Sequence, residues 1–134
     1  MKLIHRITTF ATLSTMLLAL PALAADGKHV VGDHHKSKYG GVVKEVKEVQ
    51  YELVAKSNSI AIFVEDHGKK VDSKGATAKV TLLTGKEKSE VMLLPAGENK
   101  LEAMGKFDVK SGTKVVSVVT LAGKSGVTAR FVVP

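Results

Sequence analysis

Residues 89–104 read SEVMLLPAGENKLEAM, and this stretch decides the fold class. On each side of the PAGEN segment, buried-type apolar side chains alternate with charged or flexible ones, which is the period-two pattern of a strand with one buried face. The proline, glycine and asparagine between the two runs are typical turn residues. The stretch therefore predicts a β-hairpin.

The apolar pattern also predicts the register of this hairpin, because a slip of one residue moves every side chain to the other face. The expected register pairs Leu93 with Leu101, whereas a one-residue slip would place Leu93 opposite a glutamate. The neighbouring expected pairs are Pro95 with Asn99 and Val91 with Ala103. Met92 and Met104 are then expected on the outer face, with backbones roughly 7 Å apart.

The sequence from Gly41 onward repeats this texture of short apolar runs between turn residues, with no sustained helical period. We expect strands at Val42–Val49, Tyr51–Lys56, Ile60–Glu65, Thr77–Leu83, Ser89–Leu94, Leu101–Phe107, Lys114–Leu121 and Val127–Val132. Short, evenly spaced strands predict an all-β domain, a small antiparallel immunoglobulin-like β-sandwich of about 7–8 strands. A closed barrel is the alternative architecture.

The first 24 residues have the composition of a cleavable export signal. Lys2 and Arg6 precede an apolar run at 10–20, and small residues at positions 22 and 24 suit cleavage after Ala24. The run is shorter than the roughly 20 residues of a membrane-spanning helix, so we expect no stable membrane insertion after cleavage. Removal of the signal leaves 18 basic and 13 acidic residues, a net charge of +5. The predicted location is the periplasm.

Residues 25–40 are expected to form a flexible arm ahead of the domain. They are rich in Gly, Lys, Asp and His, and only Val30, Val31 and Tyr39 are bulky and apolar. So little apolar surface does not offset the entropy lost on ordering. The predicted organisation is a signal peptide at 1–24, a His-containing arm at 25–40 and the β-sandwich at 41–134.

Several function classes lack the residues that they need. The chain has no cysteine, which removes thiolate ligands, disulfides and a cysteine nucleophile. Its acidic residues are scattered among lysines, and no Gly-x-Ser-x-Gly, His-Glu-x-x-His or phosphate-binding glycine motif is present, so we do not expect an enzyme. Nucleic-acid binding is not expected either, because few aromatic side chains accompany the excess of lysine.

Four short motifs resemble a domain of heavy-metal resistance systems. They are YGGVV at 39–43, YELV at 51–54, VEDHGKKV at 64–71 and PAGENKLEA at 95–103, and the similarity ends in Ala129-Arg130-Phe131. The family comprises small periplasmic proteins and the N-terminal domain of periplasmic adaptor subunits of heavy-metal efflux pumps of the resistance-nodulation-division type. The resemblance implies a β-sandwich and a role near metal export, and it implies no catalytic residue.

The chain departs from this family at one position that bears on a metal site. The family has His-Gly-Gly where this chain has Tyr39-Gly40-Gly41. If that histidine is a ligand in the family, this protein lacks it, and His35 and His34, four and five residues upstream, could substitute for it. The Asp66-His67 pair matches the family.

The histidines that remain after cleavage are the candidate metal ligands. Neutral imidazole is a common ligand for late first-row metals, and a neighbouring carboxylate can add to it. The predicted metal-binding residues are His29, Asp33, His34, His35 and His67. His67 precedes a glycine and is expected in an exposed turn, where it could meet the arm. The spacing matches no standard structural zinc pattern, and the alternative interpretation is a solvated polar arm without specific binding.

Met92 and Met104 form a second candidate pair, because thioethers are soft ligands that suit Cu(I). Two thioethers alone make a poor site, and partial burial against a loop or a dimer partner is the competing interpretation.

We therefore expect a periplasmic accessory protein that binds a transition metal ion (Cu, Zn, Co or Ni) and buffers it or delivers it to an efflux system. The alternative is a metal-independent interaction module that docks on an efflux-pump periplasmic adaptor subunit or forms a homodimer through a sheet edge.

Overall fold

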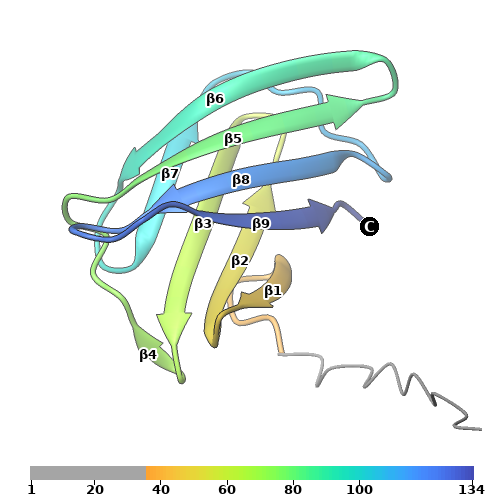
Figure 1. The fold of residues 1–134 in the computed structure, drawn as a ribbon. Helices are drawn as coiled ribbons and strands as arrows, with labels where there is room; N and C mark the ends of the chain where they lie inside the picture. The colour runs from red at the N-terminus through yellow and green to blue at the C-terminus, as the bar shows by residue number, and fades with distance from the viewer. Residues whose placement is uncertain (1–35) are drawn as a thin grey trace, which may run out of the picture.

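The computed structural model describes residues 36–134, and this part of the chain contains only β-strands and turns (Figure 1). The strands are β1 (Val42–Val46), β2 (Val49–Ala55), β3 (Ser59–Asp66), β4 (Lys69–Lys70), β5 (Thr77–Thr84), β6 (Glu87–Pro95), β7 (Lys100–Met104), β8 (Lys114–Thr120) and β9 (Val127–Val132). All paired strands are antiparallel, which confirms the predicted all-β class. None of the residues described forms a helix of the length and apolarity that a bilayer crossing needs.

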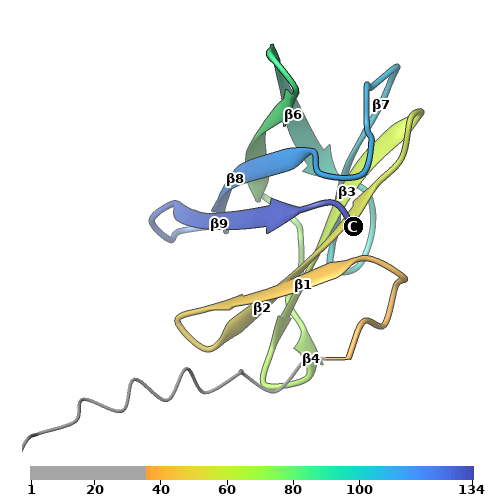
Figure 2. The same ribbon diagram turned by 90° about the vertical axis from the view of Figure 1, so that its right-hand side faces the viewer.

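The strands form a nearly closed, barrel-like sheet. Eight of them follow the order β1-β2-β3-β7-β6-β5-β8-β9, and β4 pairs with β3 outside this path. The neighbours β3–β7 and β5–β8 are not consecutive in the chain, so two connections cross over. The end strands β1 and β9 approach each other, as Figures 1 and 2 show, without forming a ladder among the pairings of the described residues.

Strand β6 connects the two layers of this sheet. It pairs with β5 from Glu87 to Leu93 and with β7 at Leu94 and Pro95. One layer therefore contains β1, β2, β3 and β7, and the other contains β5, β8 and β9. The two layers expected from the sequence are continuous through β6, and the sheet approaches the closed-barrel alternative without a ladder between its end strands.

The core follows from the period-two pattern of the strands. Every second residue of β5 is buried (Ala78, Val80 and Leu82), and the same alternation continues through β8 and β9. Leu53, Ile60 and Ile62 face these residues from β2 and β3 in the same cluster. Burial of aliphatic side chains at about 25 cal/mol per Å² is the main source of stability in a domain without disulfides.

The predicted hairpin at 89–104 forms, but its register is two residues from the expected one. Pro95 pairs with Leu101 and Leu94 with Glu102, so the predicted register, which pairs Pro95 with Asn99, Leu93 with Leu101 and Val91 with Ala103, is wrong. Asn99 lies in the turn instead, after Gly97 and Glu98, which both have positive φ. A shift of two residues keeps each side chain on its face. Leu93 and Leu101 are accordingly both fully buried, as predicted.

Another correction concerns the first predicted strand, which was expected to run from Val42 to Val49. β1 ends at Val46, and a tight turn at Lys47 and Glu48 joins it to β2. Both turn residues have positive φ, 51° and 67°, a conformation that usually favours Gly or Asn. Neither residue type signals such a turn in the sequence, which is why the prediction missed it. The strand predicted to reach Phe107 likewise ends at Met104.

Candidate functional site

A short N-terminal loop, Ser37–Gly41, is bound to the barrel by the carboxylate of Glu52 on β2. Glu52 is only 5% exposed. Its four donors are Ser37 Oγ at 2.7 Å, Lys38 N at 2.9 Å, Tyr39 N at 2.9 Å and Gly41 N at 2.8 Å. Hydrogen bonds to a charged acceptor are roughly twice as strong as neutral ones. One buried carboxylate therefore fixes the backbone of the whole loop.

The environment of Glu52 has opposing effects on its pKa. Desolvation by burial alone would raise the pKa, because it disfavours the charged form. The hydrogen bonds from Ser37 and from the three backbone N–H groups of the loop outweigh it, so the pKa of Glu52 is lowered from its ordinary value. Glu52 is thus held as a carboxylate at neutral pH.

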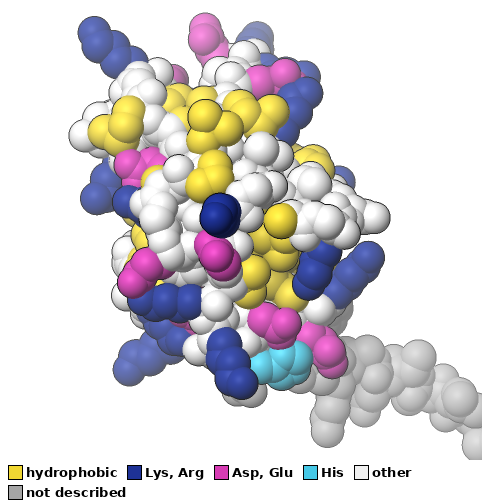
Figure 3. Space-filling view, turned by 90° about the vertical axis from the view of Figure 1, so that its left-hand side faces the viewer, with side chains coloured by type: hydrophobic (Ala, Val, Ile, Leu, Met, Phe, Trp, Pro, Cys, Tyr) yellow, Lys and Arg dark blue, Asp and Glu magenta, His cyan; other side chains and the backbone are white. Residues whose placement is uncertain are grey.

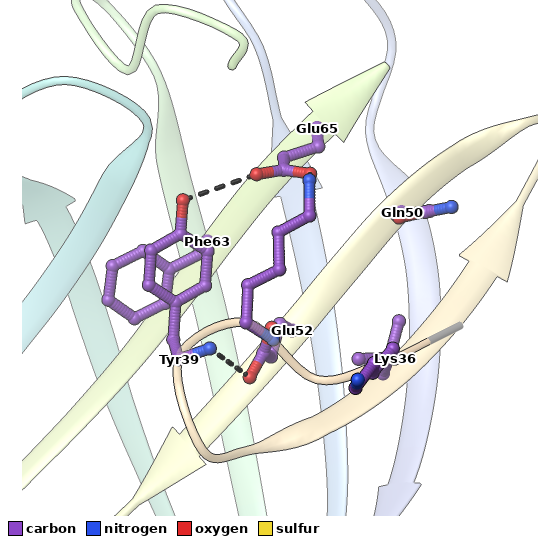
Figure 4. Close-up of a pocket in the computed structure, with 8 residues that line it drawn as sticks. Lys36, Tyr39, Gln50, Glu52, Phe63 and Glu65 are labelled. Carbon is purple, nitrogen blue, oxygen red and sulfur yellow. Dashed lines mark hydrogen bonds and ion pairs between the residues drawn. The ribbon is translucent and has the colours of Figure 1, made fainter. Parts of the chain in front are cut away.

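Tyr39 is the second anchor of the N-terminal loop (Figure 4). Its ring stacks on Phe63 of β3 with centroids 3.8 Å apart and planes at 5°. Its hydroxyl donates to Glu65 Oε1 at 3.2 Å and accepts from Asn99 Nδ2 at 3.3 Å. Tyr39 is therefore packed and hydrogen-bonded as part of the fold.

Lys38 adds an ion pair to this anchor. Its Nζ lies 2.5 Å from Glu65 Oε2, and the Glu65 side chain is 7% exposed while that of Lys38 is half exposed. The hydrogen bond to Glu65 raises the pKa of Lys38. The second buried carboxylate of the site thus has both a charged partner and a hydroxyl donor.

These contacts change where the predicted flexible arm ends. Residues 37–40 were assigned to the arm, whereas Ser37, Lys38 and Tyr39 bond to the barrel and so belong to the folded domain. The prediction missed this because the partners lie 13 to 60 residues away in the sequence. The available signal was Glu52 and Glu65, two carboxylates inside otherwise apolar runs that predict buried, partnered charges.

The second element of the site is the turn between β3 and β4, which carries His67. The predicted exposed turn is found: His67 has φ 48° and Gly68 has φ 78°, the geometry of a tight hairpin turn with two left-handed residues. His67 Nδ1 lies 2.5 Å from Asp66 Oδ1, and the imidazole is 71% exposed. This hydrogen bond and the charge of Asp66 raise the pKa of His67, with smaller contributions from Glu48 and Glu45. Figure 3 shows the histidine at one end of the molecule, between acidic side chains on one side and a basic side chain on the other.

We expect Asp66→Asn to lower the pKa of His67 toward its ordinary value of 6.5. The asparagine cannot supply the negative charge that favours the imidazolium. A ¹H–¹³C NMR titration of the His67 ring measures both midpoints, with the wild-type midpoint above that of the variant. Equal midpoints would show that Asp66 does not control the protonation of His67.

The N-terminal loop and the His67 turn lie near each other on the barrel. Lys36, the first described residue, lines the same small surface pocket as Gln50 and Glu65. Glu65 precedes His67 by two residues, which span about 6.6 Å in a strand. Lys36 therefore lies toward the end of the barrel that carries His67.

The predicted ligands divide between the two parts of the chain. His29, Asp33, His34 and His35 lie outside the described residues, and His67 is the one predicted ligand inside them. Within residues 36–134, no three His, Asp or Glu side chains are grouped as they would be around a metal ion. A site that includes His67 therefore needs further ligands from residues 1–35 or from another molecule.

Met92 and Met104 are exposed by 52% and 67%, on the outward faces of β6 and β7. The ladder between these strands covers Leu94 and Pro95 on β6, so it ends before Met92. The predicted placement of both thioethers on the outer face is confirmed, and the Cu(I) interpretation stays a prediction.

Comparisons with protein-family models, with curated proteins and with solved structures found no match.

Proposed function

We propose that this protein is a periplasmic accessory of metal efflux that binds a transition metal ion, Cu, Zn, Co or Ni, between His67 and the histidines upstream of Lys36. The observation that carries the proposal is the exposed imidazole of His67. It lies at the same end of the barrel as Lys36, the first described residue. The efflux role, the periplasmic location and the immunoglobulin-like character of the two layers rest on the sequence and its resemblance.

The geometry of the described residues supports this site in two ways. His35 is bonded to Lys36, and the three residues 33–35 span up to about 10 Å when extended, so the covalent chain permits Asp33, His34 or His35 to approach His67. The acidic side chains around His67 lower the cost of bringing a cation there. A site with one fixed and several tethered ligands suits reversible binding and transfer.

Removal of either ligand set should weaken metal binding by the mature protein. We expect His67→Asn and the triple variant His29→Ala/His34→Ala/His35→Ala each to lower affinity by about tenfold or more, roughly 1.4 kcal/mol for each factor of ten. Asparagine is chosen at position 67 because it tolerates the left-handed φ. Isothermal titration with Cu(II), Zn(II) and Ni(II), and anaerobically with Cu(I), measures the affinities.

The matched control is Lys47→Asn, which changes a left-handed, exposed residue in the neighbouring turn and removes no ligand. This variant should bind metal as the wild type does. Absence of heat with all four ions would contradict the metal proposal. Binding that survives both His67→Asn and the triple variant would remove these residues from the site.

A metal-independent interaction module is the second candidate function, and one observation favours it. β6 carries a backbone edge that lacks a strand partner over Glu87–Met92 among the described pairings. Such edges pair readily with another chain. Co-purification of an efflux adaptor subunit with a protein that binds no metal would support this candidate.

A further inference from the structure

The free edge of β6 results from the way this strand changes layers. One edge pairs with β5 without interruption, from Thr84 opposite Glu87 to Ala78 opposite Leu93. The other edge pairs with β7 only at Leu94 and Pro95. Figure 2 shows the β5–β6 hairpin and the segment after β7 separated at the top of the barrel.

The backbone groups on this edge can be assigned from the ladder. Ala96 N donates to Lys100 O at 2.8 Å, and Leu94 opposes Glu102, so even-numbered residues direct their N–H and C=O groups toward β7. Because these groups alternate along an antiparallel strand, those of Lys88, Glu90 and Met92 point to the same side. They face an open cavity of about 310 Å³, which residues 104–108 also line.

The charges on this edge are complementary to themselves in one register. In an antiparallel pair of identical strands centred on Ser89, Lys88 of each copy opposes Glu90 of the other. Centring on Lys88 or on Glu90 would instead place like charges opposite each other, which is destabilising. Within each chain, the carboxylate oxygens of Glu90 lie 3.5 Å from Lys79 Nζ and from Lys88 Nζ. All three side chains are about half exposed, so these ion pairs are weak and the side chains are free to rearrange.

We propose that the free edge of β6 pairs antiparallel with the same edge of a second copy of this chain, centred on Ser89. The two copies form a symmetric dimer in which hydrogen bonds join Lys88 and Glu90 backbones and two ion pairs join their side chains. This inference rests on the interaction-module proposal, names its partner, and does not depend on metal binding.

Charge reversal tests the register. We expect the mature protein to sediment as a dimer, and Lys88→Glu or Glu90→Lys to raise the dimer dissociation constant about tenfold, because each variant makes both cross-strand pairs repulsive. The double variant Lys88→Glu/Glu90→Lys has the wild-type composition and restores opposite charges, so it should recover the wild-type constant. Lys124→Glu, an exposed reversal in the β8–β9 loop, should leave the constant unchanged.

A thiol at the centre of the pair gives an independent test. The chain has no cysteine, and Ser89 is exposed and would oppose itself at a separation that a disulfide can bridge. Ser89→Cys should therefore form a disulfide-linked dimer under mild oxidation much faster than Ser125→Cys, a control in the exposed β8–β9 loop.

A wild-type protein that stays monomeric at its highest soluble concentration would overturn the inference, as would a dimer indifferent to both reversals. Co-purification of an adaptor subunit with a monomeric protein would still support the interaction module. The metal-binding function is tested separately by titration, so failure of the dimer inference and failure of either proposed function can be told apart.

Discussion

Glu52→Gln is expected to lower the free energy of unfolding by about 2–3 kcal/mol at neutral pH, because it removes a buried charged acceptor with four donors. Three of the four donors bond to Oε1 and Lys38 N bonds to Oε2, so the glutamine amide group replaces the acceptor of Lys38 N or of the other three, and every remaining bond loses its charged acceptor. The loop should then detach, and Tyr39 should lose its fixed stacking on Phe63. Urea denaturation measures the loss of stability.

The stability difference between wild type and Glu52→Gln should also depend on pH, in a direction set by the lowered pKa of Glu52. A carboxylate whose pKa is lower in the folded than in the unfolded state stabilises the fold at pH values above the unfolded value, here 4.5. That stability is lost as the pH falls from 4.5 through the lowered folded pKa. The stability difference between wild type and Glu52→Gln should therefore shrink on acidification, and a difference that stays constant would contradict the assignment.

Glu98→Gln is the matched control for this prediction. Glu98 forms an ion pair with Lys70 at 2.7 Å, but both side chains are more than half exposed. Exposed pairs contribute little, so this variant should change stability by less than about 0.5 kcal/mol. If Glu98→Gln lowered the free energy of unfolding more than Glu52→Gln, burial of the carboxylate would not determine how much each residue stabilises the fold.

The sequence predicts the strands of this domain well where one face of the strand is buried. It predicts less well those features that depend on how the sheet closes into a barrel. Alternation in β5, β8 and β9 is local, and these strands are found within one residue of the predicted bounds. The transfer of β6 from one layer to the other depends on how distant strands meet, which alternation does not report. The turn at Lys47 and Glu48 has no Gly or Asn, so no local signal predicts it.

The candidate site likewise has one part that the local sequence predicts and one part that depends on distant contacts. The exposed turn at His67 follows from the local sequence DHGK and is found. The anchoring of the N-terminal loop depends on Glu52 and Glu65, which bond to residues far away in the chain. Composition indicates a solvated segment there, whereas two buried carboxylates on β2 and β3 supply the partners that order it.

The Gly40-Gly41 pair of this loop leads to the largest expected loss of stability. Gly41 lies against β2, and a Cβ there would be 2.1 Å from the carbonyl oxygen of Leu53. Because that neighbour is backbone within a ladder, β1 must separate from β2, and Gly41→Ala is expected to cost about 3–5 kcal/mol. Gly40→Asn is the matched control: its φ of 79° lies in the region that asparagine tolerates, and a Cβ there meets open space, so the cost should stay below about 1 kcal/mol. Urea denaturation of both variants measures the difference, and equal losses would mean that the close approach of Gly41 to Leu53 does not hold the first strand in place.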